Sequence, residues 1–256
     1  MGIFQNNLLA GAGGQAGGGA AAFYDHQIEQ SVRFDPDGPS NLTFTPSSAG
    51  NRQVWTFSAW IKKISNDDYG RETHFILNTG SSGNQDSRLR AYFYQDKVYT
   101  SSAEYNFNQG TNLYRDVSSW YHFVWKLTGG TSYTYINGTQ DTSASVSGNV
   151  AINNSVKHTL GAQDTPSTSN SMEGYMAEVV FIDGTAYNPT TFAEEKNGVW
   201  IPKDFSSSVT FGSNGWHLKF ENASDLGNDS SGNNNDWTAN NMGTDHQVLD
   251  SPTFGS

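Results

Sequence analysis

The stretch WYHFVWKLTGGTSYTYING, residues 120–138, decides the fold of this chain. In its first half, large apolar side chains stand at every second position, which is the period of a β-strand with one buried face. Gly129-Gly130 and Asn137-Gly138 accept the positive φ angles that tight hairpin loops require. We therefore predict antiparallel strands at 120–127 and 132–136. The expected inward face of the first strand holds Tyr121, Phe123, Trp125 and Leu127.

The same alternation recurs on both sides of this hairpin, at residues 55–62 and 175–182, and indicates two further half-buried strands. One helical turn is predicted at 188–195, where Asn188 can cap the helix and Pro189 suits its first position. The expected inward faces are Trp55, Phe57, Ala59 and Ile61 in one strand and Tyr175, Ala177, Val179 and Phe181 in the other.

Composition supports an all-β chain. Of the 256 residues, 13% are aromatic and only 15% are charged, and there are 27 glycines. Aromatic residues fill pleated sheets, and glycines make the turns between strands. Many short strands with turn residues between them indicate an antiparallel β-sandwich. Shorter strands are predicted at 31–34, 42–45, 74–78, 89–94, 98–101 and 157–160.

Charge and cysteine content exclude several function classes. Fourteen basic residues against 25 acidic ones give a formal net charge of −11. Such a chain lacks the clustered cations that nucleic acids and anionic lipid surfaces attract, so we predict no nucleic-acid partner and no membrane insertion. The absence of cysteine excludes disulfides, zinc–thiolate sites and a thiol nucleophile.

The chain divides at about residue 30. Residues 1–30 contain a Gly/Ala tract at 11–22 and no charged residue before Asp25, so we predict an extended docking arm rather than a signal peptide or a membrane helix. The alternative is that the arm packs on its own sandwich, which spans 31–256 and ends in the acidic segment 221–256. The anchors expected to dock the arm on a partner are Phe4, Leu8, Leu9, Phe23 and Tyr24.

Several segments together carry a family resemblance. Residues 42–51, 55–62, 120–138 and 175–184 resemble the strands of laminin-G-like, concanavalin A-like domains. The tail is similar to structural proteins of marine tailed phages, through residues 197–203, 212–220 and 229–237. The resemblance implies a jelly-roll sandwich and a role in the virion or in host adhesion.

From this resemblance we expect a non-enzymatic structural protein on the surface of a phage particle. It would be a tail-attached adhesion or fibre module or a head decoration, and its N-terminal arm would contact other virion proteins of the capsid or tail. The resemblance also implies a homo-oligomer, with a trimer as the expected form, and a host-surface glycan as ligand. The alternative is a carbohydrate-active enzyme, a glycoside hydrolase of concanavalin-like fold, or a free lectin.

Catalytic motifs are missing from the sequence. A glycosidase needs two carboxylates that face each other across the scissile bond. Glu178 and Asp183 lie in one predicted strand, but a separation of five residues points them to opposite faces. The six histidines form no HExxH pair, and the chain has no Gly-x-Ser-x-Gly motif. We therefore predict a protein without enzymatic activity.

Sugar binding requires an exposed aromatic ring that stacks on the apolar face of a sugar. The alternative for each ring is that it covers a second hydrophobic layer. The candidates are Trp60, Trp120, Tyr105, Tyr114 and Trp237.

Calcium is a possible ligand of the C-terminal segment, although no cofactor is required. Residues 221–256 contain no Lys or Arg, and their carboxylates and amides are oxygen ligands of the kind that calcium prefers. The alternative is that Asn, Asp and Gly make tight turns there. The candidate ligands are Asp225, Asp229 and Asp236.

Overall fold

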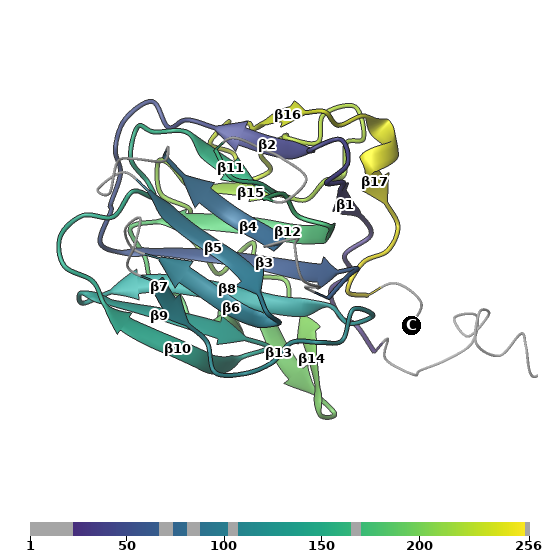
Figure 1. The fold of residues 1–256 in the computed structure, drawn as a ribbon, viewed down its shortest axis with the longest axis horizontal. Coiled ribbons are helices and arrows are strands. Elements are labelled where there is room, and N and C mark those ends of the chain that lie inside the picture. Colours follow the sequence, from purple (N-terminus) through teal and green to yellow (C-terminus); the bar gives the residue numbers. More distant parts are fainter. Residues whose placement is uncertain (1–22, 67–73, 81–87, 102–106, 165–169, 254–256) are drawn as a thin grey trace, which may run out of the picture.

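The computed structural model describes residues 23–66, 74–80, 88–101, 107–164 and 170–253. Two antiparallel sheets pack face to face as a sandwich (Figure 1). Sheet A contains, in order, β10 (Thr139–Ser145), β9 (Thr131–Ile136), β8 (Tyr121–Thr128), β3 (Trp55–Lys63), β12 (Gly174–Asp183), β1 (Ser31–Phe34) and β17 (Gln247–Val248), with β15 (Trp216–Leu218) also paired to β12. Sheet B contains β16 (Thr238–Asn240), β2 (Asn41–Phe44), β11 (His158–Leu160), β4 (His74–Thr79), β5 (Leu89–Tyr94), β6 (Lys97–Ser101) and β7 (Phe107–Gln109).

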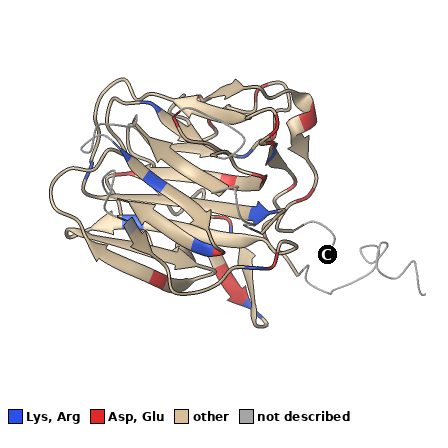
Figure 2. Cartoon of the chain, in the orientation of Figure 1, with Lys and Arg blue, Asp and Glu red and all other residues tan. Residues whose placement is uncertain are grey.

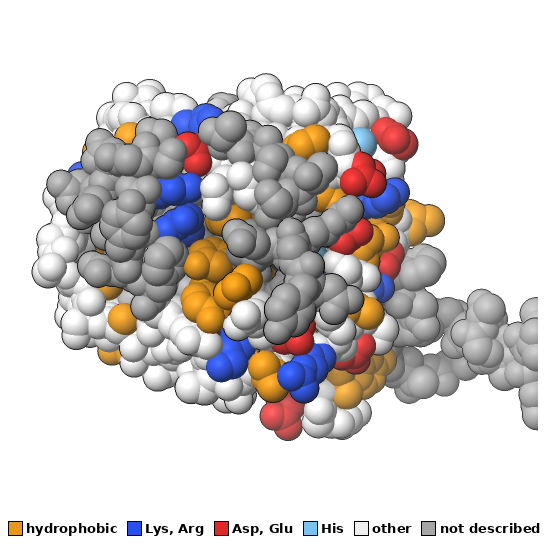
Figure 3. All heavy atoms as spheres, viewed as in Figure 1, with side chains coloured by type: hydrophobic (Ala, Val, Ile, Leu, Met, Phe, Trp, Pro, Cys, Tyr) orange, Lys and Arg blue, Asp and Glu red, His pale blue; other side chains and the backbone are white. Residues whose placement is uncertain are grey.

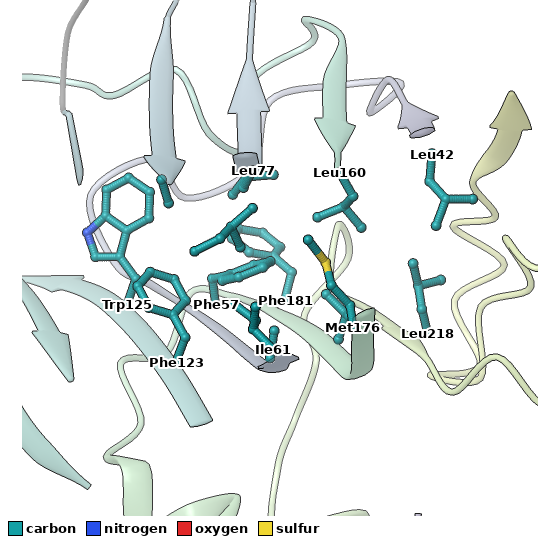
Figure 4. Packing of buried hydrophobic residues seen from close by; sticks show 14 of the residues in the cluster. Leu42, Phe57, Ile61, Leu77, Phe123, Trp125, Leu160, Met176, Phe181 and Leu218 are labelled. Carbon is teal, nitrogen blue, oxygen red and sulfur yellow. The ribbon is translucent and has the colours of Figure 1, made fainter. Parts of the chain in front are cut away.

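The inward faces predicted for β3 and β8 are confirmed. The two strands pair antiparallel, with Trp55 opposite Leu127 and Ile61 opposite Tyr121. Their inward side chains lie in one buried cluster between the sheets, where the rings of Trp55 and Trp125 meet edge to face at 5.1 Å. Figure 4 shows this layer, with side chains from both sheets pointing toward one another.

The inward face predicted for β12 is wrong in its first half. The register with β3 shifts between Ala177 and Val180, which marks a β-bulge. An extra residue in a strand reverses the alternation of all side chains before it. Met176, Val179 and Phe181 therefore belong to the core, whereas Ala177 packs on the outer face of sheet A.

The outer face of sheet A is covered by a second layer, so β3 is buried on both faces and the prediction of a half-buried strand is wrong. The cover includes the hairpin β13 (Ala193–Lys196) and β14 (Val199–Pro202). The predicted helical turn is reduced to a 3-10 turn, η2 (Pro189–Thr191), because β13 begins two residues later. Val124, Val180 and Ile182 of sheet A pack against Phe192 and Phe205 of this cover.

The C-terminal segment wraps back on the sandwich through the 3-10 turn η3 (Thr244–His246) and β17. Thr253 accepts a hydrogen bond from the Ile28 amide at 2.9 Å, and the Ser251 hydroxyl donates to the Ile28 carbonyl. Lys62 forms an ion pair with Asp250 at 2.7 Å. The two ends of the described chain are therefore joined beside sheet A. The described residues include no helix long and apolar enough to cross a membrane.

Candidate functional site: the tyrosine face of sheet B

The outer face of sheet B carries a row of aromatic side chains. In β5, Leu89, Ala91 and Phe93 enter the core, so the residues between and after them point outward. Tyr92 pairs across the strands with Tyr99 of β6. The outward side chains Phe75, Tyr92, Tyr94 and Tyr99 define the tyrosine face.

The rings of the tyrosine face form a continuous stack. Tyr92 and Tyr99 lie nearly parallel, with centroids 5.4 Å apart and an interplanar angle of 6°. Phe75 packs on Tyr92 at 5.1 Å, and Tyr94 meets Tyr99 edge to face at 5.6 Å. Phe75 and Tyr92 are buried, whereas Tyr94 and Tyr99 are half-buried. The stack is thus rigid at one end and accessible at the other.

Basic and amide groups flank the stack. Arg88 donates to Asn78 Oδ1 at 3.4 Å and to Gln163 Oε1 at 3.1 Å, and it forms an ion pair with Asp164 at 3.2 Å. Charged residues are spread over many strands (Figure 2), and on this face basic side chains lie beside a hydrophobic patch (Figure 3). Arg88 and Arg90 are themselves buried, so the half-buried rings of Tyr94 and Tyr99 are the part of this face that could stack on the apolar face of a sugar.

The hydroxyls of Tyr92 and Tyr99 stay protonated at neutral pH. Burial raises the pKa of Tyr92 to about 12, against the lowering effect of the nearby Arg90 charge. Burial also raises the pKa of Tyr99. A neutral phenol both donates and accepts a hydrogen bond, as binding of a sugar hydroxyl requires.

On the opposite side of the molecule, Glu178 and Asp183 do not form a carboxylate pair. Glu178 Oε2 accepts a hydrogen bond from His217 Nε2 at 2.7 Å. Burial acts to raise the pKa of Glu178, but the charge and hydrogen bond of His217 outweigh it and lower the pKa to about 2. Asp183 accepts from the Asn51 amide at 2.8 Å and from the Asn153 side chain. Glu178 is thus ionised and cannot donate a proton to a leaving group near neutral pH.

Ser58 and His122 lie 2.9 Å apart but lack the arrangement of a nucleophile and its base. Trp200 Nε1 donates to His122 Nδ1 at 3.0 Å. Nδ1 is therefore the acceptor nitrogen, and Nε2 carries the hydrogen and donates it to Ser58. Burial lowers the pKa of His122 to about 3. The imidazole cannot take a proton from Ser58 through a nitrogen that is already protonated.

The three predicted calcium ligands do not come together. The Asp229 carboxylate accepts the backbone amides of His217, Ser231 and Asn235 at 2.8 to 2.9 Å. Asp236 accepts the Asp229 amide at 2.8 Å, whereas Asp225 is exposed. Within the described ranges, no group of three or more acidic or histidine side chains could hold a metal ion. Asp229 and Asp236 instead tie the 229–236 loop to β15 with amide donors.

Residues 36–190 match the family model of the concanavalin A-like lectin/glucanases superfamily, Laminin_G_3. The chain belongs to this superfamily. The laminin-G-like, concanavalin A-like sandwich expected from the sequence is thereby confirmed. No curated protein sequence matches the chain significantly.

Solved structures share this lectin-like fold at low sequence identity. A putative carbohydrate binding protein from Bacteroides ovatus superposes with a TM-score of 0.58 at 15% identity, over 84% of this chain and 59% of the Bacteroides chain. A heptameric SAP-like pentraxin from Limulus polyphemus has a TM-score of 0.48 and 16% identity, over 63% of this chain and 80% of its own. Domain 4 of the GH43 arabinanase AbnA from Geobacillus stearothermophilus, solved with arabinotriose, has a TM-score of 0.48 and 16% identity, over 68% and 79%.

Two of the predicted sugar-binding rings of this lectin-like domain are buried. Trp60 is 4% exposed and stacks on His122 at 4.8 Å beneath the cover of sheet A. Trp237 is 3% exposed and packs against Trp216 at 4.8 Å. Neither ring offers a face to a sugar, so both predictions are wrong. The alternative of a second hydrophobic layer applies to Trp60, and Trp237 belongs to the core.

The other predicted rings lie apart from the tyrosine face or outside the described ranges. Trp120 donates its indole N–H to Asp250 at 3.1 Å and so holds the C-terminal segment. Tyr114 is half-buried and meets Tyr121 edge to face at 5.5 Å. Tyr105 lies outside the described residues. The tyrosine face was missed, although the alternation of Arg90, Tyr92 and Tyr94 in a predicted strand could have indicated it.

The docking residues are described only in part. Phe4, Leu8 and Leu9 lie outside the described residues. Phe23 is 37% exposed and meets the ring of Tyr24 edge to face at 4.9 Å. Lys196 of β13 lies over the Phe23 ring at 5.9 Å. The described end of the predicted arm thus packs on its own sandwich.

Proposed function

We propose that this chain is a non-enzymatic surface protein of a phage particle that binds host-surface glycans through its tyrosine face. The observation that carries the glycan proposal is the half-buried pair Tyr94 and Tyr99 at the accessible end of the aromatic stack on sheet B. Aromatic rings bind the apolar faces of sugars, and phenol and guanidinium groups bind their hydroxyls. The Bacteroides protein with the same fold, named as a putative carbohydrate binding protein, supports the same reading.

The proposal of a non-enzymatic role is supported by the chemistry of the polar pairs on sheet A. The Glu178 carboxylate is ionised and engaged by His217. The Ser58 hydroxyl receives a hydrogen bond from an imidazole that cannot act as its base. Neither pair provides the general acid or the activated nucleophile that a glycosidase uses.

The geometry of the described N-terminal segment supports attachment and recognition on opposite sides. Ile28 packs with Trp60, Ala177 and Ala193 on the outer face of sheet A. The tyrosine face lies on the outer face of sheet B. An attachment through the segment before Phe23 would therefore begin on the side of sheet A, opposite the half-buried Tyr94 and Tyr99.

The phage location rests on the similarity of residues 197–237 to phage structural proteins. We propose capsid or tail proteins as partners and a homotrimer as the assembled form. Deletion of residues 1–22 tests the docking arm, because we expect the truncated protein to fold but to be lost from purified particles. Normal incorporation of the truncated protein would show that attachment lies elsewhere.

A glycan array with matched tyrosine variants tests the binding proposal. Tyr99→Ala removes an accessible ring of the stack, and we expect it to lower binding at least tenfold, because stacking and hydrogen bonds are lost together. Tyr133→Ala is the matched control, since Tyr133 is a half-buried tyrosine on the outer side of sheet A, where Lys126 lies over its ring. Equal binding by both variants, or no binding by the wild type, would overturn the proposal.

A further inference from the structure

Sheet A contains a break on one edge of β12. Two strands pair with this edge end to end, β1 opposite residues 174–176 and β15 opposite residues 179–181. The β-bulge of β12 lies between them. Glu178 sits in the bulge with a φ of 46°, a left-handed conformation that is costly for a residue with a side chain. Backbone strain of this kind persists only where surrounding contacts hold it.

The Glu178 side chain lies at this break, and its carboxylate contacts one histidine from β15 and one from the segment before β1. His217 of β15 donates to Oε2 at 2.7 Å. His26, which precedes β1, places Nε2 3.7 Å from Oε1, within the distance of an ion pair. The side chain of Glu178 is 8% exposed, and that of His26 is 22% exposed. The His26 ring is therefore partly exposed, although its Nε2 atom is buried against the carboxylate.

A cleft of about 340 Å³ opens beside this pair and lets solvent protons reach His26. Pairing with Glu178 raises the pKa of His26, against the opposing effect of burial. The titratable groups around the pair are His217, Asp204, Lys219, Lys203, Glu29 and Glu221.

The segment that carries His26 is the described root of the N-terminal arm. The Ile28 amide donates to Thr253 Oγ1 at 2.9 Å, and Lys196 forms an ion pair with Asp25 at 3.0 Å. The bonds of Ile28 join it to hydroxyl groups of Ser251 and Thr253, which do not titrate near neutral pH. A change in the charge of His26 would therefore remove one contact that holds this segment, while the hydroxyl groups that bond Ile28 keep their protonation state.

We propose that His26 and Glu178 form a pH-sensitive latch that holds residues 23–30 against sheet A when His26 is protonated and loosens them when it is neutral. This proposal does not depend on glycan binding or on attachment to a phage particle. Because the pKa of His26 is raised on folding, the stabilisation is complete below its ordinary value of 6.5 and is lost as the pH rises through the raised value. Alkaline solution thus releases the root of the arm.

Hydrogen exchange read by mass spectrometry tests the latch on the full chain. The probe is a peptide that covers residues 23–30, including the bonded Ile28 amide, and rates are corrected for the intrinsic effect of pH. We expect its protection to fall roughly twofold to fivefold between about pH 6 and about pH 9, the size that a partly exposed ion pair can supply. A peptide that covers β8 reports on the global fold and should not change.

Two variants decide between the latch and a merely structural contact. His26→Gln should show the low protection of the alkaline form at every pH. His246→Gln is the matched control, because His246 contacts Asp245 instead of Glu178 and should keep the wild-type profile. A pH-independent wild-type peptide, or a His26→Gln profile equal to that of the wild type, would overturn the proposal.

Discussion

Part of the outer face of sheet A lies beneath a second layer, whereas outward side chains of β5 and β6 in sheet B form most of the tyrosine face. On sheet A these side chains include Val124, Val180 and Ile182, which have no polar atom and pack against Phe192 and Phe205. On β5 and β6 of sheet B they are mostly Tyr, Arg and Lys residues, which combine apolar surface with polar ends. The comparison indicates that the polarity of the outward side chains matters more than their size. Outward side chains without polar atoms are buried by a second layer, whereas side chains with polar ends can contact solvent or a ligand.

The largest expected difference between the two faces is in stability. Trp60→Ala on sheet A should lower the free energy of unfolding by about 3 to 5 kcal/mol, because a fully buried ring leaves a cavity under the cover. Tyr99→Ala on sheet B should cost no more than about 1 kcal/mol, the value of a cross-strand aromatic pair. Urea unfolding of both variants measures the two losses in the free energy of unfolding. Equal losses would show that the two faces do not differ in this way.

A smaller loss of stability is expected when the buried charge of Glu178 on sheet A is removed. Glu178→Gln should cost about 2 to 3 kcal/mol near neutral pH, because it removes a buried, ionised carboxylate that accepts a hydrogen bond from His217. The pKa of Glu178 is lowered to about 2 from 4.5, so this stabilisation is present above 4.5 and is lost as the pH falls toward 2.

Urea unfolding at a series of acidic pH values checks this sign. The stability of the wild type should approach that of Glu178→Gln as the solution becomes more acidic. Asp183→Gln serves as a second acidic variant, since Asp183 accepts hydrogen bonds from amides rather than from a histidine. A gap between wild type and Glu178→Gln that does not close toward pH 2 would show that the ion pair with His217 is not its source.

The smallest change in stability is expected at the loop of residues 229–236, which packs beside β15. Its carboxylates accept amide hydrogens, so removal of calcium with a chelator should leave the melting temperature unchanged. Differential scanning calorimetry with and without a chelator measures this. A lower melting temperature in chelator would mean that a cation replaces some of these amide donors.

Much of the fold could be predicted from local pattern. The alternation in β3 and β8 reflects a two-residue period that holds wherever a strand is regular, so the inward residues of both were identified correctly. The error in β12 arose because a bulge leaves no mark in the alternation of apolar residues, and Tyr175 and Ala177 were placed on the wrong face. The role of Trp60 was wrong because burial of the second face depends on a hairpin more than 130 residues later in the chain.

The candidate site also combines features that follow from local sequence pattern with features that depend on distant contacts. The outward row of Arg90, Tyr92 and Tyr94 was present in a predicted strand, and only its pairing with Tyr99 of β6 makes it a stack. The Glu178 site could not be predicted, since His26 and His217 are far apart in the chain and meet only where β1 and β15 share one edge of β12.

The sequence by itself determined the all-β class, the hairpin at residues 120–138 and the inward residues of its first strand, because side-chain period and turn chemistry are local properties of the chain. The tertiary structure decided which outward face is covered, where β12 bulges and which aromatic rings stay accessible. These features depend on contacts between residues distant in sequence, and such contacts are set by how the sheets, the cover and the C-terminal segment pack together.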